Sequence, residues 1–332
     1  MSALLRESVS LFAPAASAAF GVDVAAALGI PLGGHEELVF DGGEYKLRPR
    51  ESVRGRSVYV VQELFGDALG SANDRLCSLL LFIGALKDAG ARRVTACIPY
   101  LAYARQDRRT AARDPVATRY IARLFEAVDT DRVIALEVHN RAAFDNAFRC
   151  ETVHLEAAAL FARHFSIDSD GHDYAVATPD IGGANRARHV QELLQTALGR
   201  PVKFAIIDKK RSQGGVISGD LFAGEVAGRR VIIVDDLISS GTTVVHAIDA
   251  CRRAGAIRVD VAATHASFAP AARRVFDSGK PDSVVVTDSV PLSDGFSAYV
   301  KKSLSVLTIA PAFAEAIRRL ELGGSLSELG GL

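Results

Sequence analysis

Short apolar runs rich in β-branched residues recur along the chain, and alanine- and leucine-rich stretches of helical length lie between many of them. The runs begin near residues 57, 93, 132, 174, 203, 230, 258, 283 and 303. Most are apolar at nearly every position rather than at alternate ones, as is typical of strands buried on both faces of a sheet. Strands alternating with helices predict parallel sheets covered by helices, so we expect an α/β fold.

An internal repeat runs through this pattern. The sequence GRSVYVVQEL at 55–64 resembles GRRVIIVDDL at 228–237, and AGARRV at 89–94 matches AGAIRV at 254–259. Because the matching segments keep the same order, they predict two related α/β domains.

The length of 332 residues also suits about two domains. We expect an N-terminal domain at 1–150 and a C-terminal domain at 151–310, with the boundary near 145–158. Residues 311–332 remain as a C-terminal helix and tail, which can pack on either domain, the N-terminal one included.

Composition narrows the classes of partner. The charges balance at 39 basic and 39 acidic residues and tryptophan is absent, so a nucleic-acid partner is not expected. The four cysteines are far apart, which gives a zinc site no support. The longest strongly apolar run, 79–86, is too short to span a bilayer, and the first residues do not read as a signal peptide. We therefore expect a cytoplasmic protein with no membrane partner.

The segment VIIVDDLISSGTT at 231–243 combines a buried strand, two carboxylates and a turn of small residues before a predicted helix. Helix N-termini present free N–H groups and the positive end of a dipole, and so favour phosphate. Asp235 and Asp236 would repel a phosphate placed on them, but suit the hydroxyls of a sugar or an associated Mg²⁺. A 5-phosphorylated ribose fits this pattern. The alternative is that the aspartates only cap the helix and the serines only form a turn.

The first copy of the repeat lacks these groups, because it continues QELFGDALG where the second copy continues DDLISSGTT. The acidic pair and the hydroxyl turn therefore place this chemistry on the second copy.

Several motifs together resemble one enzyme family. VIIVDDLISSGTT is similar to the phosphoribosyl-diphosphate loop of phosphoribosyltransferases and of ribose-phosphate diphosphokinases (PRPP synthetases). The segment 73–110, which contains YARQD, resembles the PRPP synthetases in particular. RVIALEVHN at 132, TPDIGGANRA at 178, IIDKKR at 206 and THASF at 264 follow in that family's order, and the resemblance covers roughly 10–330.

The resemblance implies two related phosphoribosyltransferase-like domains and the transfer of diphosphate from ATP to the 1-hydroxyl of ribose 5-phosphate, giving PRPP and AMP. It also implies Mg²⁺ as cofactor and a homo-oligomer, either a dimer or a hexamer. Two alternatives remain: a phosphoribosyltransferase that consumes PRPP, and a non-catalytic PRPP synthetase-associated regulatory subunit.

The resemblance also assigns residues to roles. Lys209 and Arg211 would be catalytic, on a loop that closes over the diphosphate, and His139 and Asp180 would be metal-associated. Ribose 5-phosphate would be held by Asp235, Asp236, Ser239, Ser240, Gly241, Thr242 and Thr243. ATP would meet Phe40, Glu44, Arg105, Gln106 and Asp107, with Phe40 and Glu44 reaching the adenine bound to a neighbouring subunit.

The chain departs from the family pattern at several of its motifs. Gly42 stands where the family has an adenine-facing aspartate, which leaves the nucleotide donor open. Asn185, Thr110 and the segment after His139 also differ, so we expect regulation by ADP and phosphate to be altered or absent.

Overall fold

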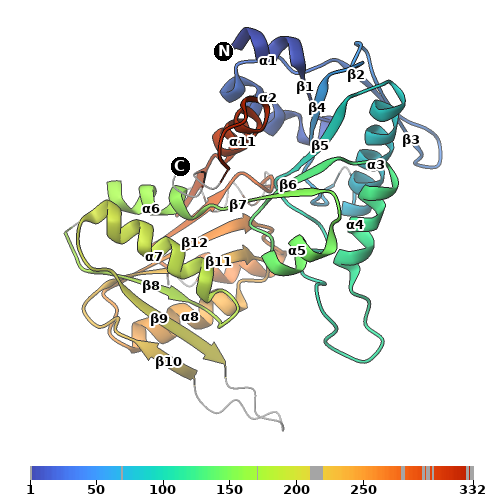
Figure 1. The fold of residues 1–332 in the computed structure, drawn as a ribbon. Coiled ribbons are helices and arrows are strands. Elements are labelled where there is room, and N and C mark those ends of the chain that lie inside the picture. Colours follow the sequence, from blue (N-terminus) through green and yellow to red (C-terminus); the bar gives the residue numbers. More distant parts are fainter. Residues whose placement is uncertain are drawn as a thin grey trace. The chain divides into compact units, whose positions relative to one another are not determined.

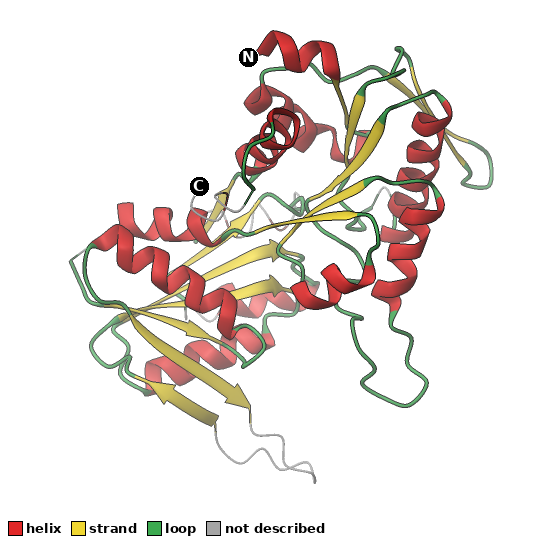
Figure 2. Cartoon of the chain, in the orientation of Figure 1, coloured by secondary structure: helices red, strands yellow, loops and turns green. Residues whose placement is uncertain are grey.

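The computed structural model describes residues 2–68, 70–169, 171–209, 220–277, 281–293, 296, 300, 303–326 and 329. The chain forms two compact units. The first contains residues 1–155 and 309–329, and the second contains residues 156–308. Each is a sheet with helices on its faces (Figures 1 and 2).

The first unit has a five-stranded sheet in the order β1-β4-β5-β6-β7, and every neighbouring pair is parallel. This unit also contains a separate antiparallel hairpin, β2-β3. The strands are β1 (Val9–Phe12), β2 (His35–Val39), β3 (Tyr45–Pro49), β4 (Ser57–Val61), β5 (Arg93–Ile98), β6 (Arg132–Leu136) and β7 (Glu151–Leu155). The helices are α1 (Ser2–Ser8), η1 (Ala15–Ser17), α2 (Ala18–Leu28), α3 (Ala72–Asp88), α4 (Ala117–Ala127), α5 (Arg141–Ala147) and α11 (Ala310–Leu322).

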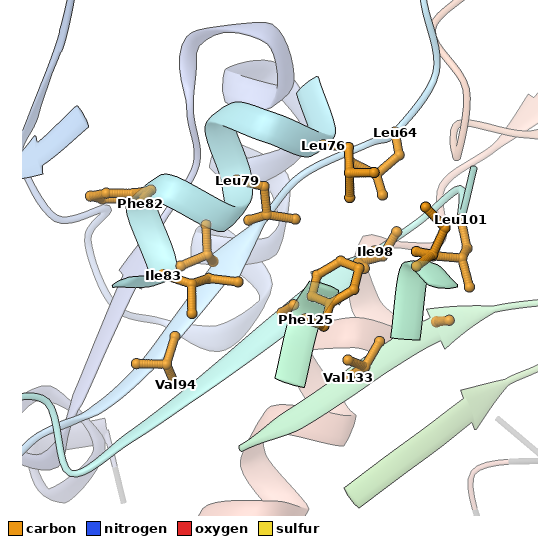
Figure 3. Packing of buried hydrophobic residues seen from close by; sticks show 14 of the residues in the cluster. Leu64, Leu76, Leu79, Phe82, Ile83, Val94, Ile98, Leu101, Phe125 and Val133 are labelled. Carbon is orange, nitrogen blue, oxygen red and sulfur yellow. The ribbon is translucent and has the colours of Figure 1, made fainter. Parts of the chain in front are cut away.

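In the first unit, successive residues of the parallel strands pack into apolar layers on opposite faces of the sheet. Val58 and Val60 of β4 join the core under α3 and α4, part of which is drawn in Figure 3. Tyr59 is also fully buried, and its hydroxyl donates to Glu321 of α11 over 2.7 Å. The last helix thus closes this unit, and it packs on α2. Burial on both faces explains why β4 is apolar at nearly every position.

The second unit has a seven-stranded sheet in the order β10-β9-β8-β11-β12-β13-β14, parallel except for the β9-β10 pair. The strands are β8 (Tyr174–Thr178), β9 (Lys203–Lys209), β10 (Asp220–Gly224), β11 (Arg230–Ile238), β12 (Arg258–Ala266), β13 (Ser283–Thr287) and β14 (Leu304–Leu307). The helices are α6 (Ala158–Ile167), α7 (Ala184–Leu198), α8 (Thr242–Arg253), η2 (Pro270–Ala272) and α9 (Arg273–Asp277). Val231 and Ile233 of β11 pack under α8, whereas Ile232 and Val234 pack under α6 and α7.

The sequence repeat is reproduced in backbone hydrogen bonds. The amide of Gly55 donates to the carbonyl of Gly90 over 2.9 Å, and the amide of Gly228 donates to Gly255 over 2.9 Å. These pairs occupy matching positions, immediately before β4 and β5 in one unit and before β11 and β12 in the other.

The match continues at the next strand. The Asp131 carboxylate, just before β6, accepts the Val94 amide over 2.7 Å. The Asp282 carboxylate, just before β13, accepts the Val259 amide over 2.7 Å. The two units are therefore related in topology and in local detail, which supports the interpretation of a duplicated domain.

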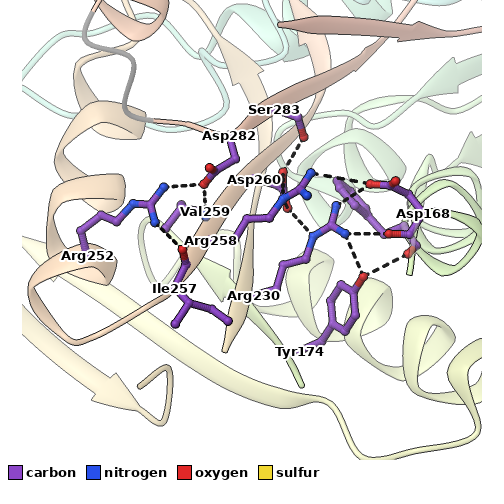
Figure 4. A network of polar contacts seen from close by, with 11 residues as sticks. Asp168, Tyr174, Arg230, Arg252, Ile257, Arg258, Val259, Asp260, Asp282 and Ser283 are labelled. Carbon is purple, nitrogen blue, oxygen red and sulfur yellow. Dashed lines mark hydrogen bonds and ion pairs between the residues drawn. The ribbon is translucent and has the colours of Figure 1, made fainter. Parts of the chain in front are cut away.

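A buried polar network secures the N-terminal end of β11 (Figure 4). Arg230 is completely buried and donates from Nε to Asp260 over 2.6 Å and from Nη2 to Asp168 over 2.8 Å. Its Nη1 also donates to the Tyr174 hydroxyl over 3.0 Å. These bonds join β8, β11, β12 and the end of α6, and fix the base of the strand whose other end carries the acidic pair.

Candidate active site

The acidic pair lies within β11 rather than after it. Asp235 is paired with Ala263 of β12, and the pairing continues to Ile238 opposite Ala266. The strand outlasts its apolar stretch because β12 still supplies hydrogen-bonding partners. The two carboxylates are therefore held on a rigid element, at the carboxyl edge of the sheet, where open α/β sheets bind ligands.

The two carboxyl groups interact strongly with each other. The Asp235 Oδ1 atom accepts the Asp236 amide over 2.8 Å. Burial, followed by the neighbouring Asp236 charge, raises the pKa of Asp235 well above its usual range. Arg186 of α7 opposes this effect on the pKa, and its Nη2 lies 3.9 Å from Oδ2 of Asp236. The pair thus favours ligands that donate hydrogen bonds or bring positive charge.

The helix after the loop, α8, begins without a side-chain N-cap, although the Thr242 amide donates a long bond of 3.5 Å to the Ser240 hydroxyl. Its N-cap is Gly241, in the left-handed region at φ 74°, which has no side chain with which to cap the helix. The hydroxyl oxygens of Ser240 and Thr242 lie 3.2 Å apart beside this turn. Backbone amides and hydroxyls converge here, as an anionic group requires.

The corresponding helix of the first unit, α3, has a capped N-terminus. Ser71 and Asp74 form a capping box on α3, in which each side chain accepts the other's backbone amide. Asp74 also places a negative charge where an anion would bind. The contrast gives a physical reason for expecting phosphate chemistry on the second copy of the repeat.

Asp180 follows β8, the strand next to β11. Its Oδ1 accepts the amide of Gly183 over 2.9 Å, and its carbonyl accepts the Thr178 hydroxyl over 2.8 Å. The carboxylate is exposed. Because α7 follows directly and carries Arg186 to the acidic pair, this turn and the end of β11 form one cluster.

In the first unit, Arg105, Gln106 and Asp107 follow β5, and His139 follows β6. Asn140 connects these loops, because its Nδ2 donates to Asp107 Oδ2 over 2.7 Å. Arg105 and Gln106 are exposed, as is His139. The structure therefore brings the predicted ATP loop and the predicted metal-associated histidine to one edge of this sheet.

Phe40 and Glu44 flank the turn of the β2-β3 hairpin. The Phe40 amide donates to the Glu44 carbonyl over 2.9 Å, and the Phe40 side chain is 49% exposed. Gly42 and Gly43 have φ values of 95° and 88°, which other residues rarely adopt. This backbone gives a reason for glycine where the family pattern has an aspartate.

The side chains of the two predicted catalytic residues lie outside the described part of the structure. Lys209 is the last residue of β9, but its side chain is outside the described part of the structure, and Arg211 lies outside the described residues. Strand β9 lies next to β8, so Lys209 ends a strand adjacent to the one that precedes Asp180.

Arg186 and Asn140 have no role that the sequence alone predicts. Both lie inside the quoted motifs, TPDIGGANRA and RVIALEVHN, so the motifs were the available signal. Their partners are 50 and 33 residues away, and only the folded chain brings them together.

Two features are absent from the described part of the structure: a membrane-spanning helix and a full set of metal ligands. No described helix combines the length and apolar character needed to cross a membrane. Among the described residues, no group of three or more histidine, cysteine, aspartate or glutamate side chains could hold a metal ion.

The architecture and the loop after β11 define a protein of two related phosphoribosyltransferase-like domains, which confirms the predicted fold class. Residues 9–128 match the model of the N-terminal domain of ribose phosphate pyrophosphokinase. Residues 218–330 match that of the phosphoribosyl synthetase-associated domain.

Full-length relatives agree with these matches. Ribose-phosphate pyrophosphokinase of Caldanaerobacter subterraneus subsp. tengcongensis is 36% identical over 97% of this chain and 98% of its own length. That of Haemophilus influenzae is 36% identical with the same coverage. The crystal structure of phosphoribosylpyrophosphate synthetase from Mycobacterium smegmatis superposes with a TM-score of 0.83 at 30% identity, covering 96% of this chain and all of that one. The chain belongs to the ribose-phosphate pyrophosphokinase family.

Proposed function

We propose that the protein transfers the diphosphate group of ATP to the 1-hydroxyl of ribose 5-phosphate, giving PRPP and AMP. The hydroxyl oxygen attacks the β-phosphorus and releases its proton to solvent, the bond from that phosphorus to the α-phosphate oxygen breaks, and AMP leaves with the electron pair. Such transfer depends mostly on positioning and on neutralising phosphate charge. The observation that carries the proposal is the N-terminus of α8, which has no side-chain N-cap, beside the partly buried acidic pair, in a chain of this family.

We assign the substrates to different units. The 5-phosphate would lie on the amides and hydroxyls of 239–243, with the ribose hydroxyls donating to Asp235 and Asp236. ATP would meet the 105–107 loop of the first unit. The tie between Asn140 and Asp107 supports this assignment, because it orders that loop next to His139.

Mg²⁺ is the cofactor we propose. His139 of the first unit and Asp180 of the second are each proposed to be associated with Mg²⁺. A single side chain cannot enclose the ion, which suits a metal that keeps several waters and takes phosphate oxygens as ligands. Its charge would offset that of the diphosphate. Asp180 suits such a contact, because its exposed carboxylate is oriented by one bond to the Gly183 amide.

Lys209 and Arg211 are proposed to contact the transferring diphosphate. We also propose a homo-oligomer, a dimer or a hexamer, in which Phe40 and Glu44 reach the adenine site of a neighbouring subunit. The exposed aromatic ring at the tip of a hairpin supports that role.

The test is a product assay with purified protein, Mg²⁺, ribose 5-phosphate and ATP or another nucleoside triphosphate. We expect AMP and PRPP in equal amounts. Release of diphosphate from PRPP and a base, without AMP formation from ATP, would instead identify a phosphoribosyltransferase. Substrate binding without turnover would identify a regulatory subunit. The panel of nucleotides determines the donor that Gly42 leaves open.

A further inference from the structure

The turn after β12 supports the 239–243 loop directly. The amide of Phe268 donates to the Ile238 carbonyl over 3.0 Å, and that of Ala269 donates to Ser239 over 3.1 Å. Val275 of α9 fills the space beside Gly241, where an added Cβ would lie 2.2 Å from its Cγ2. The turn after β12 and helix α9, for which the sequence alone predicts no role, therefore pack against the proposed phosphate site.

This turn also brings a cation to the loop. Arg274 of α9 donates from Nη1 to the Thr242 hydroxyl over 3.2 Å, and from Nε to the Ala271 carbonyl over 2.9 Å. The side chain is otherwise exposed. Since a guanidinium has five N–H donors, these two bonds fix its position and leave donors for an anion.

The charge balance of the site calls for such a cation. The side chains of 239–243 are uncharged, and the acidic pair lies just before them. A phosphate monoester adds roughly −1.5 to −2 charges at pH 7. Arg186 lies beside Asp236, whereas Arg274 is bonded to the hydroxyl turn itself. Arginine suits this task because its planar fork binds phosphate oxygens and stays charged.

We propose that Arg274 is a binding residue for the 5-phosphate, and that it favours phosphorylated over free ribose by donating to a phosphate oxygen beside Thr242. The proposal deepens the proposed function and rests on it for the identity of the sugar phosphate.

The test is calorimetric titration of the full chain with ribose 5-phosphate. The Arg274→Ala variant removes a charged donor to the phosphate, so it should bind ribose 5-phosphate about 10- to 100-fold more weakly. Arg274→Lys keeps the charge without the fork and should lose less. Arg229→Ala is the matched control, because it removes one arginine of the same unit beyond the opposite end of β11, and it should bind as the wild type does.

Further readouts separate a binding role from a structural one. Arg274→Ala should weaken the salt dependence of ribose 5-phosphate binding, because one screened attraction is lost. The same variant should leave the KM for ATP within about twofold of the wild-type value, because the proposed contact of Arg274 is with ribose 5-phosphate and not with ATP. If Arg274→Ala does not fold, Arg274→Gln keeps part of the stem and an N–H donor, and removes the charge with less loss of packing.

The outcomes are distinct. Wild-type affinity for ribose 5-phosphate in a folded Arg274→Ala or Arg274→Gln variant overturns the proposal. If the wild type binds ribose 5-phosphate through Arg274 but releases no AMP from ATP, the proposed activity fails and the binding role stands. If the wild type does not bind this sugar phosphate at all, both fail.

Discussion

Asn140 donates a hydrogen bond from Nδ2 to Oδ2 of Asp107 over 2.7 Å, while its Oδ1 accepts the amide of Ala143 over 3.1 Å. One side chain thus caps α5 and ties the loop after β6 to the loop after β5. Because these loops carry His139 and the 105–107 segment, the bond sets the spacing of the proposed ATP site.

Asn140→Asp separates these two roles. Aspartate is as good an N-cap as asparagine, so α5 should form normally. It has no N–H to donate, however, and places a like charge beside Asp107. We expect the KM for ATP to rise by about 10-fold, from a lost hydrogen bond of about 1 kcal/mol and added repulsion. Steady-state kinetics measures this, with an unchanged KM for ribose 5-phosphate as control. Equal increases in both KM values would contradict the assignment.

Gly241→Ala should weaken ribose 5-phosphate binding strongly. The residue has φ 74°, and a Cβ would lie 2.2 Å from Val275 Cγ2, so the loop must move. Gly228→Ala is the matched control, because that glycine has φ 69° and nothing within 4 Å of the added Cβ. Both changes cost about 1–2 kcal/mol of backbone strain, but only Gly241→Ala should weaken binding, by more than about 10-fold. Titration with the sugar phosphate decides; similar losses in both variants would disprove the steric argument.

Asp235→Asn should stabilise the ligand-free protein at neutral pH. Burial and the Asp236 charge raise the pKa of Asp235, so the folded chain holds this proton more tightly than the unfolded chain does. The associated stability is fully present below the unfolded pKa of about 4 and is lost as pH rises through the folded pKa. Asparagine cannot ionise and avoids that loss.

Thermal melting from about pH 4 to pH 8 measures this effect, and a gain of a few degrees is expected near pH 7. The difference between Asp235→Asn and the wild type should shrink as pH falls. Asp173→Asn, at an exposed carboxylate of the same unit, is the control. Parallel melting curves for Asp235→Asn and the wild type at all pH values would rule the argument out.

Arg230→Met should destabilise the second unit strongly. It leaves Asp260 buried, with Ser283 and Arg258 as its remaining partners in the network. Removing one member of a buried ion pair costs about 3–5 kcal/mol. Arg229→Met, at the adjacent and partly exposed position, should change stability by less than about 0.5 kcal/mol. Urea denaturation compares the two, and similar midpoints would show that the network contributes little.

The sequence by itself determined the fold class and the duplication. Continuous apolar strands alternating with helices admit few arrangements other than covered parallel sheets, and this prediction is confirmed. Paired residues such as Gly55 with Gly90 and Gly228 with Gly255 show that the repeat is also a repeat of structure. The acidic pair and hydroxyl turn were recognisable because adjacent residues form them.

Only the tertiary structure decided which distant groups meet these motifs. Arg186 reaches Asp236, and Arg274 reaches Thr242, across 50 and 32 residues, and neither contact follows from local spacing. The sequence did not decide on which domain the last helix packs, because an amphipathic helix can cover either sheet. The hydrogen bond between Tyr59 and Glu321 ties this helix to the first unit. Local propensity fixes elements and turns, whereas such contacts depend on how the strands are ordered and on which side chains that order buries together.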